Sequence, residues 1–270
     1  MREAVKKQIK CVNKRRFILL FIIFCLSISV FCFHIFIKLR DDKANSDIRN
    51  ELNNIYEESE DDNGEKKEIT RIDKLLELKQ VNSDIVALIE IEGTNINYPV
   101  LQCDNNDYYM NHNYKKEYSK DGSLFLDKSY NWSIPSTNLL IYGHNNIGSK
   151  EMFVELMNYK KEDFYKKHKQ IELETLQGHE EYEIIAAFTT PVYTDHDFEY
   201  YKFTATEDPA EFDNYVRQCK EKSIYETRKT AQYGQRLLTL STCEYSQKNG
   251  RMVIVAVQTY KPIKAAKEGE

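Results

Sequence analysis

The segment Thr239–Val255 reads TLSTCEYSQKNGRMVIV and holds two apolar runs separated by a polar loop. Cys243 ends the first run, and Arg251 opens the second run eight residues later. Short apolar runs flanked by Ser, Asn and Gly predict β-strands. If these strands are neighbours joined by the loop 244–250, the thiol and the guanidinium face one another at the base of the loop. The segment therefore predicts a strand pair with Cys243 and Arg251 side by side at one end.

Similar strand patterns recur along the chain, and short helical patterns interrupt them. Strands are expected at residues 88–91, 95–101, 123–126, 139–142, 170–175, 182–190, 236–240 and 252–259. Helices are expected at residues 69–82, 152–159, 162–168 and after the capping pair Asp208-Pro209. About eight short strands without a βαβ array predict a mainly β fold, a closed eight-stranded β-barrel with peripheral helices.

One apolar stretch near the N-terminus differs from all the others in length. Residues 17–37 read FILLFIIFCLSISVFCFHIFI and contain no Asp, Glu, Lys or Arg. At about 1.5 Å per residue, a helix of this length spans roughly 30 Å, the thickness of a bilayer core. A secretory signal has a shorter apolar part and a small-residue cleavage site, whereas Lys38-Leu-Arg-Asp41 follows here. The stretch predicts a single uncleaved transmembrane helix ahead of the barrel.

The charges around this stretch predict its direction in the membrane. Residues 1–16 carry seven Lys or Arg side chains, opposed only by Glu3. The positive-inside rule places such an arm in the cytoplasm and the rest of the chain outside. A basic arm can also bind nucleic acid, but its position beside the apolar run favours membrane topology, and no nucleic-acid partner is expected. After the run, residues 41–68 are almost wholly polar and predict a flexible stalk with a helical part near residues 48–56.

The cysteines divide along the same boundary. Of six in the chain, only Cys103, Cys219 and Cys243 follow the predicted anchor, so at least one external thiol stays unpaired. Cys219 falls at helical spacing with Phe212, Tyr215 and Val216, and this pattern predicts a core residue. An external thiol left over in this way calls for a functional explanation.

Nucleophilic cysteine chemistry needs a thiolate, a proton partner and a donor for the developing oxyanion. Cys243 and Arg251 could supply the thiolate and a permanent positive charge. Read singly, Cys243 could instead be an inert strand residue and Arg251 a surface salt-bridge partner. Five histidines follow the anchor, and only His144 comes directly after an apolar strand, in LLIYGH. His144 is therefore the best candidate proton partner, with a hydrogen-bonded core histidine as the alternative.

These residues resemble a known family. TLSTC with an arginine eight residues later, preceded by LLIYGHNN, is similar to the sortases, membrane-anchored cysteine transpeptidases of Gram-positive bacteria. The resemblance is greatest to class B and rests also on GRMVIVA, on IEIEGTNINYPVLQ and on the helix-bearing insertion before the Cys243 strand. It implies five segments: a cytoplasmic arm (1–16), a transmembrane anchor (17–37), a polar linker (38–68), a sortase catalytic domain (69–262) and a tail (263–270).

The resemblance also implies roles for single residues. Cys243 would be the nucleophile, His144 the general acid and base, and Arg251 the stabiliser of the oxyanion or substrate carbonyl. Ser241 and Glu244 would line the site as substrate-binding residues, and the region 193–200 would help to shape the pocket. No cofactor is implied, and no metal is expected because the acidic runs lie in the polar linker.

The implied reaction joins two acyl transfers. The thiolate would cleave an LPXTG-like or NPXTN-like sorting signal of a surface protein after its Thr. The thioester would then pass to an amine of a peptidoglycan cross-bridge or its lipid II precursor at the cell membrane. Three alternatives stay open: a hydrolytic cysteine protease with the same residues, a non-catalytic anchored binding module, and a polymerase that joins pilins through a lysine.

Overall fold

Helices, 3₁₀ turns and strands follow one another along the chain. The computed structural model describes residues 2–54, 59–60, 66–67, 70–133, 137–193 and 198–260. The helices and 3₁₀ segments are α1 (Arg2–Asn53), α2 (Arg71–Val81), η1 (Tyr108–Met110), η2 (Val154–Lys160), α3 (Glu162–Lys167), η3 (Tyr200–Lys202) and α4 (Pro209–Lys222). The strands are β1 (Ser59–Glu60), β2 (Lys66–Lys67), β3 (Ile85–Glu90), β4 (Asn97–Leu101), β5 (Leu124–Leu126), β6 (Asn138–Tyr142), β7 (Gln170–Thr175), β8 (Gly178–Pro191), β9 (Leu237–Glu244) and β10 (Gly250–Tyr260).

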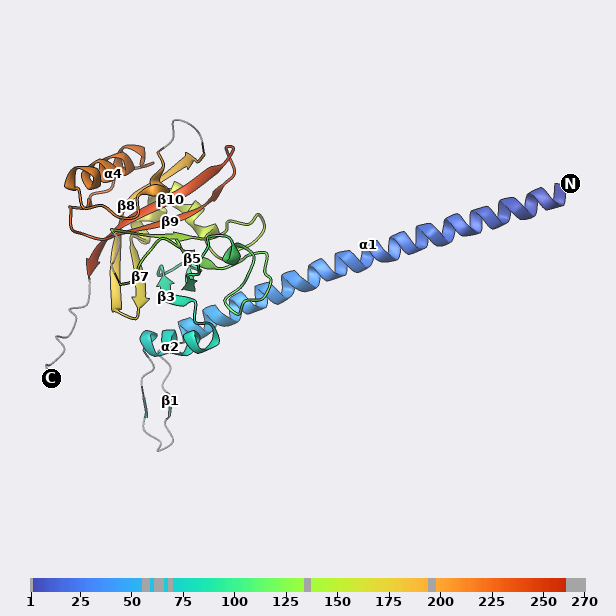
Figure 1. Ribbon diagram of the computed structural model, residues 1–270, viewed down its shortest axis with the longest axis horizontal. Helices are drawn as coiled ribbons and strands as arrows, with labels where there is room; N and C mark the ends of the chain where they lie inside the picture. The colour runs from blue at the N-terminus through green and yellow to red at the C-terminus, as the bar shows by residue number, and fades with distance from the viewer. Residues whose placement is uncertain are drawn as a thin grey trace. The chain divides into compact units, whose positions relative to one another are not determined.

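Eight of these strands close into a barrel, as the sequence predicts (Figure 1). Their order around the barrel is β10-β8-β7-β3-β4-β5-β6-β9, and β9 pairs with β10 to close it. The pairs β4–β5 and β6–β9 are parallel and the other pairs are antiparallel. The short strands β1 and β2 form a separate two-stranded sheet. Parallel pairing of β6 with β9 matters for function, because it brings the carboxyl ends of two distant segments to one edge.

The strand β10 is apolar without alternation because both of its faces are covered. Met252, Ile254 and Ala256 belong to one buried cluster with the other barrel strands and α2. The alternating residues Val253 and Val255 belong to a second cluster, together with the apolar face of α4. Successive side chains of a strand point to opposite faces, so a strand covered on both sides needs apolar residues throughout.

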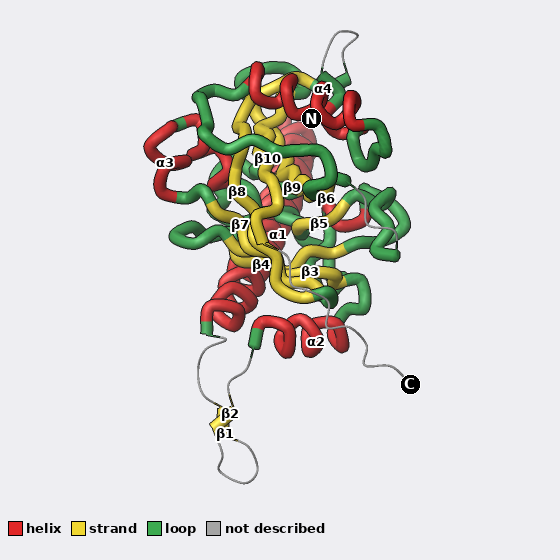
Figure 2. Tube along the Cα trace, turned by 90° about the vertical axis from the view of Figure 1, so that its left-hand side faces the viewer, coloured by secondary structure: helices red, strands yellow, loops and turns green. Residues whose placement is uncertain are grey.

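The predicted helices beside the barrel are confirmed at α2 and α4. Thr70 caps α2 through a capping box with Asp73, and Asp208 caps α4 by accepting a hydrogen bond from the Ala210 amide. The two helices lie toward opposite ends of the barrel (Figure 2). Cys219 on α4 is fully buried, as predicted, and this burial raises the pKa of its thiol.

The helix expected at residues 152–159 forms as the 3₁₀ segment η2 instead. Met152, at the start of the predicted range, has φ of 55°, in the left-handed region that a right-handed helix cannot include. The helical segment therefore begins after Met152, at Val154. This turn follows directly on the loop that leaves the end of β6.

The structure comprises two units, Met1–Ala44 and Asn45–Glu270. In the first unit, the apolar part of α1 leaves its side chains exposed, among them Phe17 at 70% and Phe24 at 60%. The helix segment Arg16–Asn53 is long and apolar enough to cross a membrane. It is therefore a candidate membrane span, because exposed aromatic and aliphatic side chains on this scale suit lipid better than water.

In the second unit, the end of α1 packs on the barrel and does not form a free spacer. Ile48 and Leu52, four residues apart on one helix face, are 1% exposed and belong to the main core cluster. Between them, the Arg49 guanidinium contacts the Glu151 carboxylate at 2.6 Å and the Tyr98 hydroxyl at 2.5 Å. Part of the predicted linker is thus packed, and the residues 55–58, 61–65 and 68–69 of this region lie outside the described part of the chain.

Candidate active site

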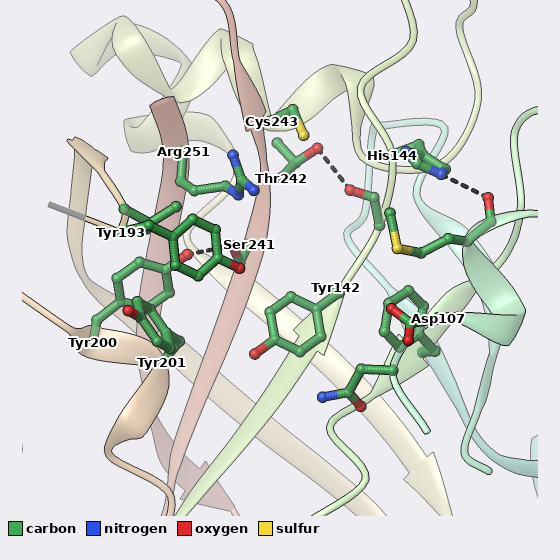
Figure 3. Close-up of a pocket in the computed structure, with 15 residues that line it drawn as sticks. Asp107, Tyr142, His144, Tyr193, Tyr200, Tyr201, Ser241, Thr242, Cys243 and Arg251 are labelled. Atoms are coloured by element: carbon green, nitrogen blue, oxygen red, sulfur yellow. Dashed lines mark hydrogen bonds between the residues drawn. The ribbon is translucent and has the colours of Figure 1, made fainter. Parts of the chain in front are cut away.

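The ends of β6, β9 and β10 surround a cavity of about 230 Å³. Cys243, His144, Arg251 and Ser241 all line this cavity (Figure 3). Apolar and aromatic side chains from the neighbouring loops form much of the remaining wall, including Met110 and Val192. Four of the five residues singled out from the sequence therefore meet at one place.

The pairing of β9 with β10 places Cys243 directly opposite Arg251. The two residues are partners in the antiparallel register, and the loop between them begins after Glu244. Residues directly opposite in such a pair project to the same face with Cβ atoms about 4.5–5.5 Å apart. The Arg251 guanidinium donates to the Gly250 carbonyl at 2.9 Å and forms no ion pair with any residue that the structure describes. The alternative that Arg251 is a surface salt-bridge partner is therefore not supported.

The pairing of β6 with β9 brings His144 to the same edge. The parallel ladder runs to the pair Tyr142 and Ser241, so the residues that follow each strand leave the barrel side by side. Gly143 lies between the strand and the histidine, and a Cβ added there would approach a side-chain carbon of Leu124 to 2.3 Å. Glycine is needed for this close packing, which holds the start of the His144 loop against the barrel.

The His144 ring is held by a backbone carbonyl. Its Nε2 lies 2.7 Å from the Met110 oxygen, drawn as a dashed line in Figure 3. A carbonyl oxygen only accepts hydrogen bonds, so Nε2 carries the proton in this arrangement and Nδ1 is the basic nitrogen of the neutral ring. The figure shows the Cys243 sulfur between the Arg251 guanidinium and the His144 ring. The three groups thus adjoin one cavity.

Ser241 is tied to an aromatic wall of the cavity. Its hydroxyl is 2.6 Å from the Tyr200 hydroxyl, and both side chains are buried. Burial raises the pKa of Tyr200 to about 12, so this phenol stays protonated at neutral pH and keeps its hydrogen bond. Ser241 lies two residues before Cys243 on the same strand face. This arrangement puts a small polar group and a rigid ring beside the thiol.

The cavity rim contains a tyrosine in an uncommon backbone conformation. Tyr193 has φ of 64°, which is costly for a bulky side chain, and its side chain is 74% exposed. Its ring lies 5.9 Å from the ring of Tyr201, centroid to centroid. Together with Tyr142 and Tyr200 these side chains make one side of the cavity aromatic. Strain of this kind concentrates at functional sites, and Tyr193 and Tyr200 bound the region that the sequence analysis expects to shape the pocket.

Glu244 is the residue that the structure does not bring into the cavity. Its side chain is 3% exposed, and its carboxylate contacts the Lys160 ammonium at 2.7 Å. The same carboxylate accepts hydrogen bonds from the amide and hydroxyl of Ser246. Although burial opposes it, the hydrogen bonds from Lys160 and Ser246 lower the pKa of Glu244 below its ordinary value. The carboxylate thus ties the β9–β10 loop to η2.

The Glu244 carboxylate is expected to make stability depend on pH in acid. Because its pKa is lower in the folded than in the unfolded chain, its contribution is complete above the ordinary value near 4.5 and is lost as pH falls through the folded pKa. Thermal unfolding of Glu244→Gln should therefore show a flatter stability curve below about pH 4.5 and a loss of about 1–2 kcal/mol at neutral pH.

A second variant removes the cation and keeps the carboxylate. In Lys160→Met the pKa of Glu244 rises toward or above its ordinary value, because burial remains and the charge partner is lost, so the loss of stability below about pH 4.5 should shrink or disappear. Identical stability curves for the wild-type chain and both variants between pH 3 and 7 would contradict this role.

Two contacts of the site escaped the sequence analysis. The Met110 carbonyl that holds His144 belongs to η1, 34 residues earlier in the chain, and a backbone oxygen has no sequence signature. Asn145 donates from its side chain to the Cys243 carbonyl at 2.8 Å. The only sequence signal for Asn145 was its position, directly after His144 at the start of a polar loop.

The residues that the structure describes contain no group of three or more His, Cys, Asp or Glu side chains placed to hold a metal ion. The three cysteines after the apolar helix, Cys103, Cys219 and Cys243, are all free thiols. Of these three thiols, Cys243 is the one that lines the cavity.

Comparisons with known proteins agree with this arrangement. A family model described as Sortase domain matches residues 89–259. Sortase B of Listeria monocytogenes is 36% identical over 184 residues, which cover 67% of this chain and 72% of that protein.

Solved structures are similar over the same region. The Staphylococcus aureus sortase B–substrate complex matches with a TM-score of 0.66 and 28% identity, over 83% of this chain and 96% of that one. A sortase B complexed with triglycine matches with a TM-score of 0.63 and 33% identity, over 69% of this chain and 85% of that one. The chain therefore belongs to the sortase family, in its class B, and is a cysteine transpeptidase.

Proposed function

We propose that Cys243 is the nucleophile of this transpeptidase, with His144 as general acid and base and Arg251 as the stabiliser of the oxyanion. The observation that carries the proposal is the convergence of the three side chains on one cavity, with Cys243 and Arg251 directly opposite in the strand register. Ser241 is proposed to contact the substrate from the same wall. Glu244 keeps only a supporting part in the proposal, through the loop that it holds to Lys160.

The proposed first step breaks a peptide bond. The Cys243 thiolate attacks the Thr carbonyl carbon of a sorting signal, and the carbonyl oxygen becomes an oxyanion beside the Arg251 guanidinium. His144 then delivers a proton to the leaving nitrogen, the C–N bond breaks, and a thioester remains on Cys243. Because Nε2 is held by Met110, Nδ1 is the nitrogen that carries this proton.

The proposed second step forms a new peptide bond. An amine attacks the thioester carbonyl, His144 takes the proton that the amine loses, and the thiolate of Cys243 leaves. Arg251 faces the oxyanion again, since the same carbonyl carbon reacts. The net result is transfer of the acyl group from one nitrogen to another, with the Cys243 thiolate and the protonated His144 ring of the starting state restored.

The relatives support a proposal for the two substrates. The Staphylococcus aureus sortase B structure holds its substrate, and another sortase B structure holds triglycine. We propose that this chain takes an LPXTG-like or NPXTN-like sorting signal of a surface protein as acyl donor. The proposed acceptor is an amine of a peptidoglycan cross-bridge or of lipid II.

We further propose that α1 anchors the enzyme in the cell membrane. Residues 1–16 would lie in the cytoplasm, 17–37 would cross the bilayer, 38–68 would lead to the catalytic domain at 69–262, and 263–270 would form a tail. The basic arm and the exposed apolar side chains of α1 support this topology. Protease treatment of intact cells should remove the barrel and spare an epitope placed at the N-terminus. Loss of that epitope would indicate the opposite orientation in the membrane.

The proposed reaction can be tested with the full chain in detergent. Peptides with either motif are incubated with and without triglycine, and the products are identified by mass spectrometry. We expect cleavage after Thr, a transient acyl adduct on Cys243, and an amide product that appears only with the amine. Cleavage that ignores triglycine and yields no amide would identify a hydrolytic protease instead.

A further inference from the structure

The residues on both sides of His144 are tied to the strand that carries Cys243. Backbone pairing between β6 and β9 ends with the Gly143 amide, which donates to the Ser241 carbonyl at 3.2 Å. Beyond that point, hydrogen bonds from side chains connect the two segments in place of backbone pairing. The Thr242 hydroxyl donates to the Gly143 carbonyl at 2.7 Å, and the Asn145 amide donates to the Cys243 carbonyl at 2.8 Å. His144 therefore lies between two residues that are each bonded to the Cys243 segment.

Asn145 is held from a second direction as well. Its own backbone carbonyl accepts a hydrogen bond from the Tyr245 hydroxyl at 2.6 Å. Asn145 thus links to the residue that carries the thiol and to the residue two positions later. Its side chain is largely buried at 8% exposure, so the loss of one partner leaves a buried polar group unsatisfied. These contacts restrain the loop that begins at His144.

We propose that Asn145 is a positioning residue, whose side-chain amide sets the separation and orientation of His144 relative to Cys243. The proposal rests on the proposed roles of these two residues. Asn145 does not line the cavity and so does not act on the substrate directly. Its effect comes from a closed ring of bonds. The chain joins His144 to Gly143 on one side and to Asn145 on the other, Gly143 accepts a hydrogen bond from Thr242, and Asn145 donates one to the backbone of Cys243.

The chemistry of the contact requires a hydrogen-bond donor at this position. The Cys243 carbonyl is an acceptor, so its partner must donate, and a carboxylate in the same place would face it with a second acceptor. The geometry matters because proton transfer and thiolate attack need atoms placed within a fraction of an ångström, and a displacement of about 1 Å can cost about 100-fold in rate.

The test compares Asn145→Ala with a matched control on the same strand pair. Asn138, at the other end of β6, is also buried and also donates from its side chain to a backbone carbonyl, that of Phe203 at 2.9 Å. Both variants of the full chain in detergent are assayed for peptide cleavage and for thermal unfolding. Asn145→Ser, which removes the amide but keeps a polar group, provides a second variant if the alanine chain folds poorly.

We expect Asn145→Ala to lower kcat by about 10- to 100-fold, to change KM by less than about threefold, and to move a limb of the pH–rate profile. Asn138→Ala should lose comparable thermal stability while kcat stays within about threefold and the pH profile is unchanged. A kcat within twofold of wild type for Asn145→Ala and Asn145→Ser, or an equal loss in Asn138→Ala, would overturn the inference.

A further variant separates this inference from the proposed function. If Cys243→Ala is inactive while the Asn145 variants are normal, the positioning role alone fails. If Cys243→Ala still cleaves and transfers, the proposed function itself fails, and the role of Asn145 falls with it.

Discussion

Replacing Cys243 by alanine is expected to abolish both peptide cleavage and transfer to the amine. Without the thiol no thioester can form, and kcat/KM should fall by at least about 10⁴-fold, equivalent to about 5.5 kcal/mol of transition-state stabilisation. The fold should survive, because Cys243 lies half-buried at the cavity wall and alanine is smaller than cysteine. Mass spectrometry should show no acyl adduct, and the thermal midpoint should stay close to that of the wild-type chain.

Cys103→Ser is the matched control for this loss. Cys103 is also a half-buried free thiol, but it donates to the Asn105 carbonyl and does not line the cavity. The serine hydroxyl can keep that hydrogen bond, so full activity is expected. In the wild-type chain, an alkylating reagent should modify Cys243 faster than Cys103. Cleavage and transfer that persist in Cys243→Ala, together with equal alkylation of the two thiols, would show that Cys243 is not the nucleophile.

The pair Cys243 and Arg251 could be predicted from the sequence because its geometry is local. Two apolar runs joined by a short polar loop form neighbouring strands, and the residues at the two sides of the loop must then face one another. The structure adds only the register, in which these two residues are direct partners. His144 could be predicted in the same way, from its position just beyond a buried strand.

The contacts between distant segments could not be predicted. The hydrogen bond from His144 to the Met110 carbonyl depends on how η1 lies against the loop that follows β6, and a backbone oxygen is present at every residue. The contact of Ser241 with Tyr200 depends on the path of the connection after β8. These links are long-range in sequence, so local periodicity carries no information about them.

Glu244 and the end of α1 show two different limits of prediction from the sequence. Glu244 follows Cys243 on a strand, where consecutive side chains point to opposite faces, so the carboxylate turns away from the cavity toward Lys160. Sequence adjacency to the nucleophile was therefore a poor guide to its role. Ile48 and Leu52 could not be recognised as core residues because the residues around them are polar. Their spacing of four nevertheless places them on one helix face against the core.

Arg251→Ala is expected to lower kcat/KM by about 10²- to 10³-fold, the usual cost of losing a donor to the oxyanion. The effect should fall mainly on kcat, because the negative charge on the carbonyl oxygen develops in the transition state. Arg251→Lys keeps the positive charge but loses the planar arrangement of donors, so an intermediate loss of about 10-fold or more is expected.

Arg217→Ala provides the control for the loss of a positive charge. Arg217 lies exposed on α4, where it pairs with Glu221 on the same helix, and its removal should leave kcat and KM unchanged. The division between kcat and KM then assigns the role of Arg251. A loss confined to KM would mean that Arg251 binds the ground-state carbonyl of the sorting signal without favouring the oxyanion. Activity of Arg251→Ala within threefold of wild type would remove the guanidinium from the mechanism. The pairing of Arg251 with Cys243 in the register of β9 and β10 would then be structural and not catalytic.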